Sequence, residues 1–436
     1  MNLHNLLQRR AENGERVRAG LIGAGKFGSM FLSQIPTIAG LDVPVIADLD
    51  VERAKAACAA VGWPDVLIER TRFVDSGEEL IASGRADVVI DATGHPAAGL
   101  KHALLALEHG RHLVMVNVEA DVLAGPVLAE KFRNAGLVYS MAYGDQPALT
   151  AEMVDWARAT GFDVVAAGKG TKYLADYHNI TPDTVWQHYG LNADEARAAG
   201  MNSQMFTSFM DGTKSAIEMA AIANACDLQA PSDGLLFPPC NVDDLQSVLR
   251  PRAVGGTLEV SGQVEVVSSL ARDGSDLERD LRWGVYVVLE APNDYAAACF
   301  AQYGLNTDDT GQYASMYKPF HLIGLELSIS VLSAALRGEP TGHSRHFNGD
   351  AVACAKRDLN PGDMLDGEGG FMVWGKLLPA AKSLQMAALP IGLAGGIKLA
   401  RPVKQGEIVR WSDVAIDEDA LDVKLRRELE SRFAPD

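Results

Sequence analysis

Residues 18–50 read RAGLIGAGKFGSMFLSQIPTIAGLDVPVIADLD and carry a G-x-G-x-x-G spacing at Gly23, Gly25 and Gly28. A short apolar run precedes these glycines, and apolar residues at helical spacing follow them. In a strand–turn–helix unit, the first glycine permits the tight turn and the second lets a pyrophosphate approach the main chain. The third lets the helix pack closely on the strand. The stretch therefore predicts a dinucleotide site with its phosphates at the helix N-terminus; an ordinary strand-to-helix turn is the alternative.

A second apolar run, residues 43–47, ends at Asp48, which lies 20 residues after Gly28. A carboxylate at the end of the second strand accepts a hydrogen bond from a ribose 2′-hydroxyl and repels a 2′-phosphate, which favours NAD. Arg53 follows five residues later and is close enough in sequence to influence that choice. NAD(H) and NADP(H) therefore both stay open as the coenzyme.

Strand-like and helix-like segments alternate over residues 18–140, which predicts a doubly wound parallel sheet with right-handed crossovers. Strands are expected at 87–91, 112–118 and 137–140, with helices at 97–109 and 124–135. Ligands of such sheets bind beyond the carboxyl ends of the strands, so the loops there should share one rim. The candidate coenzyme-binding residues are Gly23, Gly25, Lys26, Phe27, Gly28, Asp48, Ala92, Thr93, Gly94, Asn117 and Glu119.

The composition excludes some partners. The chain has 436 residues and a formal net charge of −18, which argues against nucleic acid or an anionic membrane as the main partner. Its five cysteines are scattered and form no C-x-x-C pair, as is typical of reduced thiols in a cytoplasmic enzyme. No signal peptide or transmembrane segment is expected. A small-molecule substrate and a homodimer or larger homo-oligomer are the expected partners.

The pattern changes after residue 144. We expect a helix and a strand over 145–165, a loop at 166–176, a helix-rich stretch at 202–228 and antiparallel strands at 257–270 and 282–291. One apolar helix is expected over 317–337, packed back on the first domain, and a linker over 338–350. A small β-rich module with a C-terminal helix follows. The expected domains are 1–144, 145–337 and 338–436, the second of α+β type.

The string DVVIDATGHPAAGLKHALLALEHGRHLVMVNVEAD (87–121) resembles the nucleotide-binding domain of homoserine dehydrogenases, although Val118 stands where those enzymes usually carry lysine. A closer resemblance is to the 1-deoxy-D-xylulose 5-phosphate reductoisomerase-like proteins, which have a C-terminal SAF module. It is carried by AYGDQPAL (142–149), AAGKGTKY (166–173), DGTKSAIEMA (211–220), YKPFHLIGLEL (317–327) and LPIGLAGGIKL (389–399). It implies a Rossmann domain, a substrate domain and an SAF-like module. The implied activity is NADPH-dependent rearrangement and reduction to 2-C-methyl-D-erythritol 4-phosphate.

Cationic side chains are the expected catalytic groups, because negative charge develops on a carbonyl oxygen as it receives a hydride. Lys169 and Lys172 lie in the glycine-flanked segment, and Lys214 lies where a helix is expected to begin. Glu218 follows Lys214 by one turn and could pair with it. The homoserine-dehydrogenase resemblance implies that Asp211 and Lys214 face the substrate. The catalytic candidates are therefore Lys214, Asp211, Lys169, Lys172, Asp145 and Glu218.

Asp145 and Glu152 are seven residues apart and should share one helix face. They could hold Mg²⁺ or Mn²⁺, which assists a rearrangement by gripping both oxygens of an α-hydroxyketone; charges that complement the helix dipole are the alternative. Three functions stay open on the sequence. These are the reductoisomerase, a homoserine-type or sugar-acid dehydrogenase of carbohydrate catabolism, and a nucleotide- or sugar-binding regulatory protein without catalysis.

Overall fold

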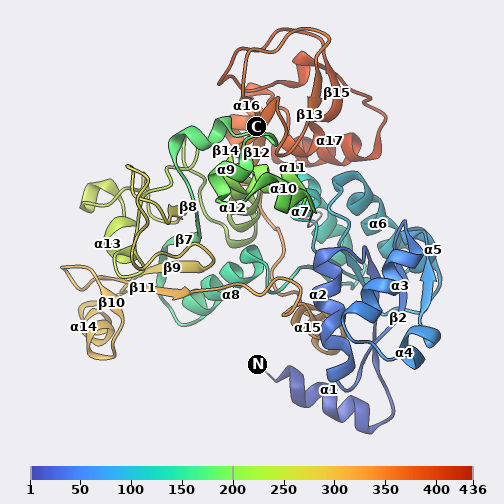
Figure 1. The fold of residues 1–436 in the computed structure, drawn as a ribbon. Coiled ribbons are helices and arrows are strands. Elements are labelled where there is room, and N and C mark those ends of the chain that lie inside the picture. Colours follow the sequence, from blue (N-terminus) through green and yellow to red (C-terminus); the bar gives the residue numbers. More distant parts are fainter. Residues whose placement is uncertain (1, 199–200, 435–436) are drawn as a thin grey trace. The chain divides into compact units, whose positions relative to one another are not determined.

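The computed structural model describes residues 2–198 and 201–434, whose helices and strands are drawn in Figure 1. The chain divides into two compact units. The N-terminal unit comprises residues 1–152 and 321–345, and the second unit comprises residues 153–320 and 346–436. These two units are compact regions, and their bounds do not show which parts of the chain fold independently. The three expected domains therefore stay a prediction.

A six-stranded sheet forms the centre of the N-terminal unit (Figure 1). Its order is β3-β2-β1-β4-β5-β6, and every neighbouring pair is parallel. This is the doubly wound order, which reverses direction between β1 and β4. The expected parallel α/β sheet is confirmed. Its strands are β1 (Val17–Ile22), β2 (Leu41–Ala47), β3 (Arg72–Val74), β4 (Val88–Asp91), β5 (His112–Met115) and β6 (Tyr139–Met141).

Helices cover both faces of this sheet. On one face, side chains of α1, α2, α3 and α15 join Ala19 and Leu21 of β1 in one apolar core. The neighbouring β1 residue, Gly20, faces the other way, where an added Cβ would lie 2.8 Å from Leu80 of α5. The helices of this unit are α1 (Leu3–Glu12), α2 (Lys26–Gln34), α3 (Val51–Ala60), α4 (Asp65–Arg70), α5 (Gly77–Ala82), α6 (Pro96–Glu108), α7 (Val118–Asn134) and α15 (Ser328–Arg337).

The second unit contains a five-stranded mixed sheet of order β10-β11-β9-β7-β8. Strand β7 pairs in parallel with β8 and antiparallel with β9, so it separates the two segments that were expected to be antiparallel. Both expected strands are present: β9 is antiparallel to both of its neighbours, as predicted, whereas β8 pairs in parallel with β7. The strands are β7 (Asp163–Thr171), β8 (Gln263–Ser268), β9 (Val285–Glu290), β10 (Asn306–Thr307) and β11 (Tyr313–Lys318).

Helix α12 (Thr213–Cys226) packs against this sheet and also against the two-stranded sheet of β12 (Gly349–Ala355) and β14 (Val373–Pro379). A helix covered on several sides must be apolar around most of its circumference. Of the fourteen residues described in α12, Lys214 alone is not buried. The Asn224 side chain bonds the main chain of Asn348 and Gly349, which fixes the start of β12 on the helix.

The expected β-rich region with a C-terminal helix is present after residue 348. Besides β12 and β14 it contains a three-stranded sheet of order β13-β15-β16, namely β13 (Met364–Asp366), β15 (Gly395–Leu399) and β16 (Val414–Ala415). The remaining helices are α8 (Gln146–Ala159), α9 (Val185–Tyr189), α10 (Ala193–Ala198), α11 (Ser203–Met210), α13 (Leu245–Val248), α14 (Asp294–Gln302), α16 (Ala380–Met386) and α17 (Leu421–Phe433).

Three expected elements differ in the structure. The segment expected as a loop at 166–176 continues β7 as far as Thr171. The helix expected over 317–337 begins only at Ser328, because β11 extends to Lys318; the helix does pack on the core of the N-terminal unit, as predicted. Helix α7 begins at Val118 rather than at 124, because the Asn117 side chain accepts a hydrogen bond from Ala120 N and caps it.

Among the described residues, no helix combines the length and the apolar character needed to cross a membrane.

Candidate coenzyme and catalytic sites

The glycine turn between β1 and α2 has the geometry that each glycine was predicted to provide. Gly23 has a φ of +98°, and a Cβ there would lie 2.6 Å from Ala92 O at the end of β4. A Cβ at Gly28 would lie 2.3 Å from Gly23 O, so this position allows the close packing of helix on turn. A Cβ at Gly25 would meet no atom within 4 Å. The turn therefore leaves an open position at Gly25, where a pyrophosphate can approach the main chain.

The N-terminus of α2 fits an anionic group. Gly25 is its N-cap, no side chain caps the first turn, and that turn contains no acidic residue. The first helical hydrogen bond runs from Ser29 N to Gly25 O, so the amides before Ser29 lie at the uncapped end of the helix. Lys26 is exposed there, and Phe27 packs partly against the core. These residues would hold the diphosphate of a dinucleotide through main-chain amides and the helix dipole.

Asp48 lies just after β2, as expected, but its carboxylate is turned into the protein. It accepts hydrogen bonds from Ala24 N at 2.9 Å and Asp50 N at 3.0 Å, and its Oδ1 lies 2.6 Å from a guanidinium nitrogen of Arg53. The Asp48 side chain is 3% exposed, whereas that of Arg53 is 62% exposed. Asp48 thus ties the glycine turn to the end of β2, and Arg53 presents the exposed charge.

The loops after β4 and β5 come together, as the rim prediction requires. Asp91 ends β4, and its Oδ1 accepts hydrogen bonds from the Thr93 hydroxyl at 2.9 Å and from Thr93 N at 3.3 Å. Asn117 Nδ2 donates to Thr93 Oγ1 at 3.4 Å and joins the two loops. Ala92 backs Gly23, and Gly94 takes a φ of +65°, which suits glycine. The structure therefore brings Ala92, Thr93, Gly94 and Asn117 to the carboxyl edge of the sheet.

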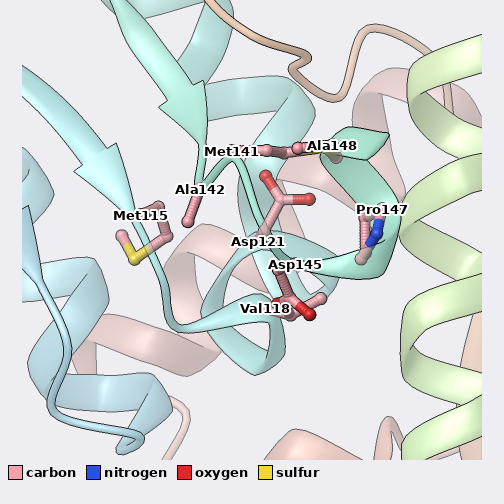
Figure 2. Close-up of a pocket in the computed structure, with 8 residues that line it drawn as sticks. All are labelled: Met115, Val118, Asp121, Met141, Ala142, Asp145, Pro147 and Ala148. Carbon is pink, nitrogen blue, oxygen red and sulfur yellow. The ribbon is translucent and has the colours of Figure 1, made fainter. Parts of the chain in front are cut away.

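A pocket in the N-terminal unit lies where β5 and β6 end (Figure 2). Figure 2 shows its lining residues, Met115, Val118, Asp121, Met141, Ala142, Asp145, Pro147 and Ala148. Asp121 is buried and accepts from Tyr139 Oη at 2.9 Å and Ser344 Oγ at 2.6 Å. Burial raises the pKa of its carboxyl to about 6, although both hydrogen bonds act to lower the pKa. Glu119, the coenzyme candidate beside it, lies half-buried in the first turn of α7.

The structure gives each of the two residues proposed for a metal ion a hydrogen-bond partner inside the protein, and their role toward a metal stays a prediction. Glu152 accepts a hydrogen bond from the Tyr143 hydroxyl, and Asp145 Oδ1 accepts from Gln146 N at the start of α8. Within residues 2–198 and 201–434, no group of three or more His, Cys, Asp or Glu side chains is arranged to hold a metal ion. The comparisons below likewise give no support for a divalent cation.

Lys169 and Glu218 form a buried ion pair that joins β7 to α12. The prediction that Lys169 lies in a loop is wrong, because Gly168 and Gly170 serve the packing of the sheet. A Cβ at Gly168 would lie 1.9 Å from Glu265 O, and one at Gly170 would lie 1.9 Å from Leu281 O. The partner that the structure gives Glu218 is Lys169, whereas Lys214 had been expected. Lys214 does lie at the start of α12, as predicted, one turn from Glu218.

Asp211 is fully buried before α12 and lies 2.7 Å from Lys356 Nζ. Lys356 also donates to Ile180 O at 2.6 Å and Gly370 O at 2.8 Å. The sequence had marked Asp211 as facing the substrate, but this carboxylate is engaged inside the second unit, where its Oδ1 also accepts from Thr213 N. Lys356 was missed because 145 residues separate it from Asp211 and it belongs to no spacing motif.

His178 is a further group that the sequence did not single out. Its Nδ1 lies 2.6 Å from Asp211 O and its Nε2 lies 2.9 Å from Tyr173 Oη, while Trp374 stacks on the ring at 3.8 Å. Since a carbonyl oxygen only accepts, Nδ1 carries the hydrogen. Burial lowers the pKa of His178, which favours the neutral ring, so the Tyr173 hydroxyl donates to Nε2. This network holds the turn that precedes α12.

Lys172 follows β7 and donates to His188 O at 2.9 Å. Burial lowers the pKa of this lysine, and the nearby Arg282 lowers it further. Lys172 therefore binds the main chain of α9 in the structure, and a role for it toward a substrate stays a prediction.

Glu265 of β8 gives a pH-dependent prediction. Burial raises the pKa of its carboxyl from 4.5 to about 7, although the N–H groups of Leu236, Phe237 and Val266 donate to it. A raised folded-state pKa means that the folded state binds the proton more tightly, so this contribution to stability is full below pH 4.5 and is lost as the pH rises through 7. Relative to the wild type, Glu265→Gln should gain about 2–3 kcal/mol in free energy of unfolding between pH 5 and pH 8.

Urea unfolding of both proteins at several pH values measures that difference. If the free energies of unfolding of wild type and Glu265→Gln changed with pH in the same way, Glu265 would not titrate as described.

Two family models match different parts of the chain. Residues 23–139 match the family model described as homoserine dehydrogenase, NAD binding domain. Residues 144–327 match the model described as oxidoreductase DRL, catalytic domain. No curated protein gave a significant match. The first model confirms the predicted NAD-binding region, and the second confirms that an oxidoreductase catalytic region follows it.

Solved structures show weaker likeness. The myo-inositol dehydrogenase from Lactobacillus casei in complex with NAD(H) and myo-inositol is 14% identical, with a TM-score of 0.35; the match covers 63% of this chain and 71% of that one. The WlbA dehydrogenase from Bordetella pertussis, in complex with NADH and UDP-GlcNAcA, is 14% identical with a TM-score of 0.35, covering 63% and 74%. These scores are too low to carry an argument about function.

The glycine turn, the doubly wound sheet and the two family models agree on the class of enzyme. The chain is an NAD(P)-dependent oxidoreductase.

Proposed function

We propose that this enzyme transfers hydride between NAD(P) and the carbonyl or alcohol carbon of a small hydroxylated substrate, such as a sugar acid or a homoserine-like compound. The observation that carries the proposal is the open position at Gly25, at the uncapped N-terminus of α2 and beside the point where the strand order reverses. A bound nicotinamide supplies or accepts the hydride, and the protein must bind, orient and stabilise charge.

Charge on the substrate oxygen requires a cation or a proton donor. The Lys169–Glu218 pair and Lys214 are our candidates, because all three belong to one region of β7 and α12 in the segment that matches an oxidoreductase catalytic domain. Glu218 fixes the Lys169 ammonium in one orientation, which suits it to meet charge as it develops. Asp211, Lys172 and Asp145 remain weaker candidates, because their observed partners lie within the protein.

Reductoisomerisation of 1-deoxy-D-xylulose 5-phosphate is the second candidate. One observation favours it: the match to the oxidoreductase DRL catalytic domain spans the stretches 166–173 and 211–220 that carry the sequence resemblance. The divalent cation that such a rearrangement uses has no fitted site among the described residues, so we rank simple hydride transfer first. An SAF identity for residues 338–436 belongs to the same candidate.

A substrate screen distinguishes the candidates. Sugar acids, polyols, homoserine and 1-deoxy-D-xylulose 5-phosphate would be offered with each coenzyme in both redox states, with and without Mg²⁺. Absorbance change at 340 nm with a sugar acid, polyol or homoserine supports simple dehydrogenation. Turnover confined to the deoxyxylulose phosphate and NADPH supports the second candidate. Coenzyme binding without turnover of any compound would favour the regulatory alternative.

A cytoplasmic location and a homo-oligomeric state also belong to the proposal. All five cysteines are free thiols in the structure, which agrees with a reducing compartment. Burial raises the pKa of the Cys58 and Cys354 thiols to about 11, so neither is poised as a reactive thiolate.

Arg53 should set the affinity for the 2′-phosphate of NADPH. Its guanidinium is the exposed charge at the end of β2, while the Asp48 carboxylate is buried and bonded. We expect both coenzymes to bind, and Arg53→Ala to weaken NADPH binding about tenfold while NADH binding stays the same or strengthens. Isothermal titration calorimetry with each coenzyme measures this change.

Lys55→Ala provides the matched control. Lys55 lies on α3, as Arg53 does, and its ammonium pairs with Glu52. It should leave both affinities unchanged. Equal losses for NADH and NADPH on Arg53→Ala would show that Arg53 does not contact the 2′-phosphate.

A further inference from the structure

A fully buried carboxylate lies beside the proposed coenzyme site of the N-terminal unit. Asp91 is the last residue of β4, the strand next to β1 where the sheet order reverses. It has partners on both oxygens: Thr93 N and the Thr93 hydroxyl on Oδ1, and His102 Nδ1 at 2.6 Å on Oδ2. Its burial and full engagement point to a positioning role rather than to contact with a ligand.

The direction of each hydrogen bond follows from the carboxylate. Because a carboxylate oxygen accepts, the Thr93 hydroxyl donates its hydrogen to Asp91. Thr93 Oγ1 is then left with lone pairs only. Asn117 Nδ2 at 3.4 Å and His95 N at 3.5 Å are long contacts to them, so a coenzyme donor at the usual distance of about 2.8–3.0 Å would replace one of the two. Toward a ligand at the carboxyl edge of the sheet, the Thr93 hydroxyl can therefore only accept a hydrogen bond and cannot donate one.

His102 of α6 holds the other side of Asp91. Its Nδ1 must carry the hydrogen, because the facing Asp91 Oδ2 accepts. A Cβ at Gly77 would lie 2.4 Å from His102 Nε2, so the first residue of α5 packs directly on the ring. Three elements, α5, α6 and β4, thus fix one orientation of the Asp91 carboxylate.

We propose that Asp91 and His102 are positioning residues that make Thr93 Oγ1 a fixed hydrogen-bond acceptor for a hydroxyl or amide donor of the coenzyme. This inference rests on the proposed coenzyme site and specifies its chemistry. The location supports it: Thr93 follows directly after Ala92, whose carbonyl backs Gly23 of the phosphate-binding turn.

Asp91→Asn is the informative substitution. His102 Nδ1–H keeps the amide oxygen on its side, so the amide NH₂ faces Thr93 and donates to Oγ1, while the Thr93 N–H loses the acceptor it has in the wild type. The Thr93 hydroxyl must then point its hydrogen elsewhere, and its polarity toward the coenzyme reverses. NADH affinity should fall about tenfold with Asp91→Asn and to a similar extent with Thr93→Val, while Thr93→Ser, which keeps the hydroxyl, should stay within about threefold of wild type.

The test is a double-mutant cycle on the NADH dissociation constant, measured by calorimetry on the full chain. If Asp91 acts through Thr93, Asp91→Asn/Thr93→Val binds no more weakly than Thr93→Val alone. The inference would be overturned if the two losses of NADH affinity multiplied in the double variant, or if Thr93→Val bound NADH as tightly as the wild type. If Asp91→Asn fails to fold, the Thr93→Val and Thr93→Ser pair still decides it. Absence of NADH binding by folded wild type would instead refute the proposed function.

Discussion

Gly25→Asp should abolish coenzyme binding while leaving the fold as stable as the wild type or more stable. Gly25 is the N-cap of α2 in extended backbone geometry, and a Cβ there meets no protein atom within 4 Å. Aspartate is a favoured N-cap and complements the helix dipole, so the free energy of unfolding should rise by up to about 1 kcal/mol. The same carboxylate would fill the space for the pyrophosphate and repel it, so affinity should fall by at least about 100-fold.

Calorimetric titration with NADH, together with urea unfolding, measures both effects on the same samples. Gly25→Asn is the matched control, because it keeps the shape and the cap but removes the charge; its loss of affinity should be clearly smaller. Retained NADH affinity in a folded Gly25→Asp protein would contradict the placement of the diphosphate at this helix end.

Arg426→Met should destabilise the second unit by about 3–5 kcal/mol. Arg426 and Asp350 are both fully buried and form a bidentate pair, with nitrogen–oxygen distances of 3.0 and 2.6 Å, that joins α17 to β12. Removing the guanidinium leaves the Asp350 carboxylate buried, with Ser383 Oγ as its remaining side-chain donor in the described structure. Since folded proteins are stable by only about 5–15 kcal/mol, the effect should be visible as an early unfolding transition in urea.

Arg427→Met is the matched control on the same helix. Arg427 pairs with Glu418 and Glu430 at a side-chain exposure of 38%, and such pairs contribute about 0–1 kcal/mol. Replacing both Arg426 and Asp350 with apolar residues should recover part of the loss, because no unpaired charge is left. Equal effects of Arg426→Met and Arg427→Met would mean that burial does not make the Arg426 pair special.

The N-terminal unit was predictable because its signals are local. The three glycines act within one turn, and each strand follows its predecessor at the spacing of a βαβ unit. The sequence thus predicts the parallel sheet and the rim that carries Thr93 and Asn117. What it could not show is the orientation of Asp48, because the same carboxylate can bind a ribose or the Ala24 amide.

The second unit was less predictable because its partners lie far apart in the sequence. Lys169 meets Glu218 across 49 residues, and Asp211 meets Lys356 across 145. Gly168 and Gly170 are typical of a loop, yet they lie inside β7, where neighbouring main chains leave no room for a side chain. The end of the predicted 317–337 helix was right, but Pro319 and Gly324, with a φ of +74°, interrupt its first half.

The central claim is that main-chain amides at the N-terminus of α2 bind the diphosphate of a nicotinamide coenzyme. Titration of the folded wild-type chain with NADH and NADPH in a calorimeter tests it most directly. We predict saturable binding of one coenzyme per chain, competed by the oxidised form. A well-folded protein that releases no binding heat and shows no change in NADH fluorescence with either coenzyme would contradict the claim.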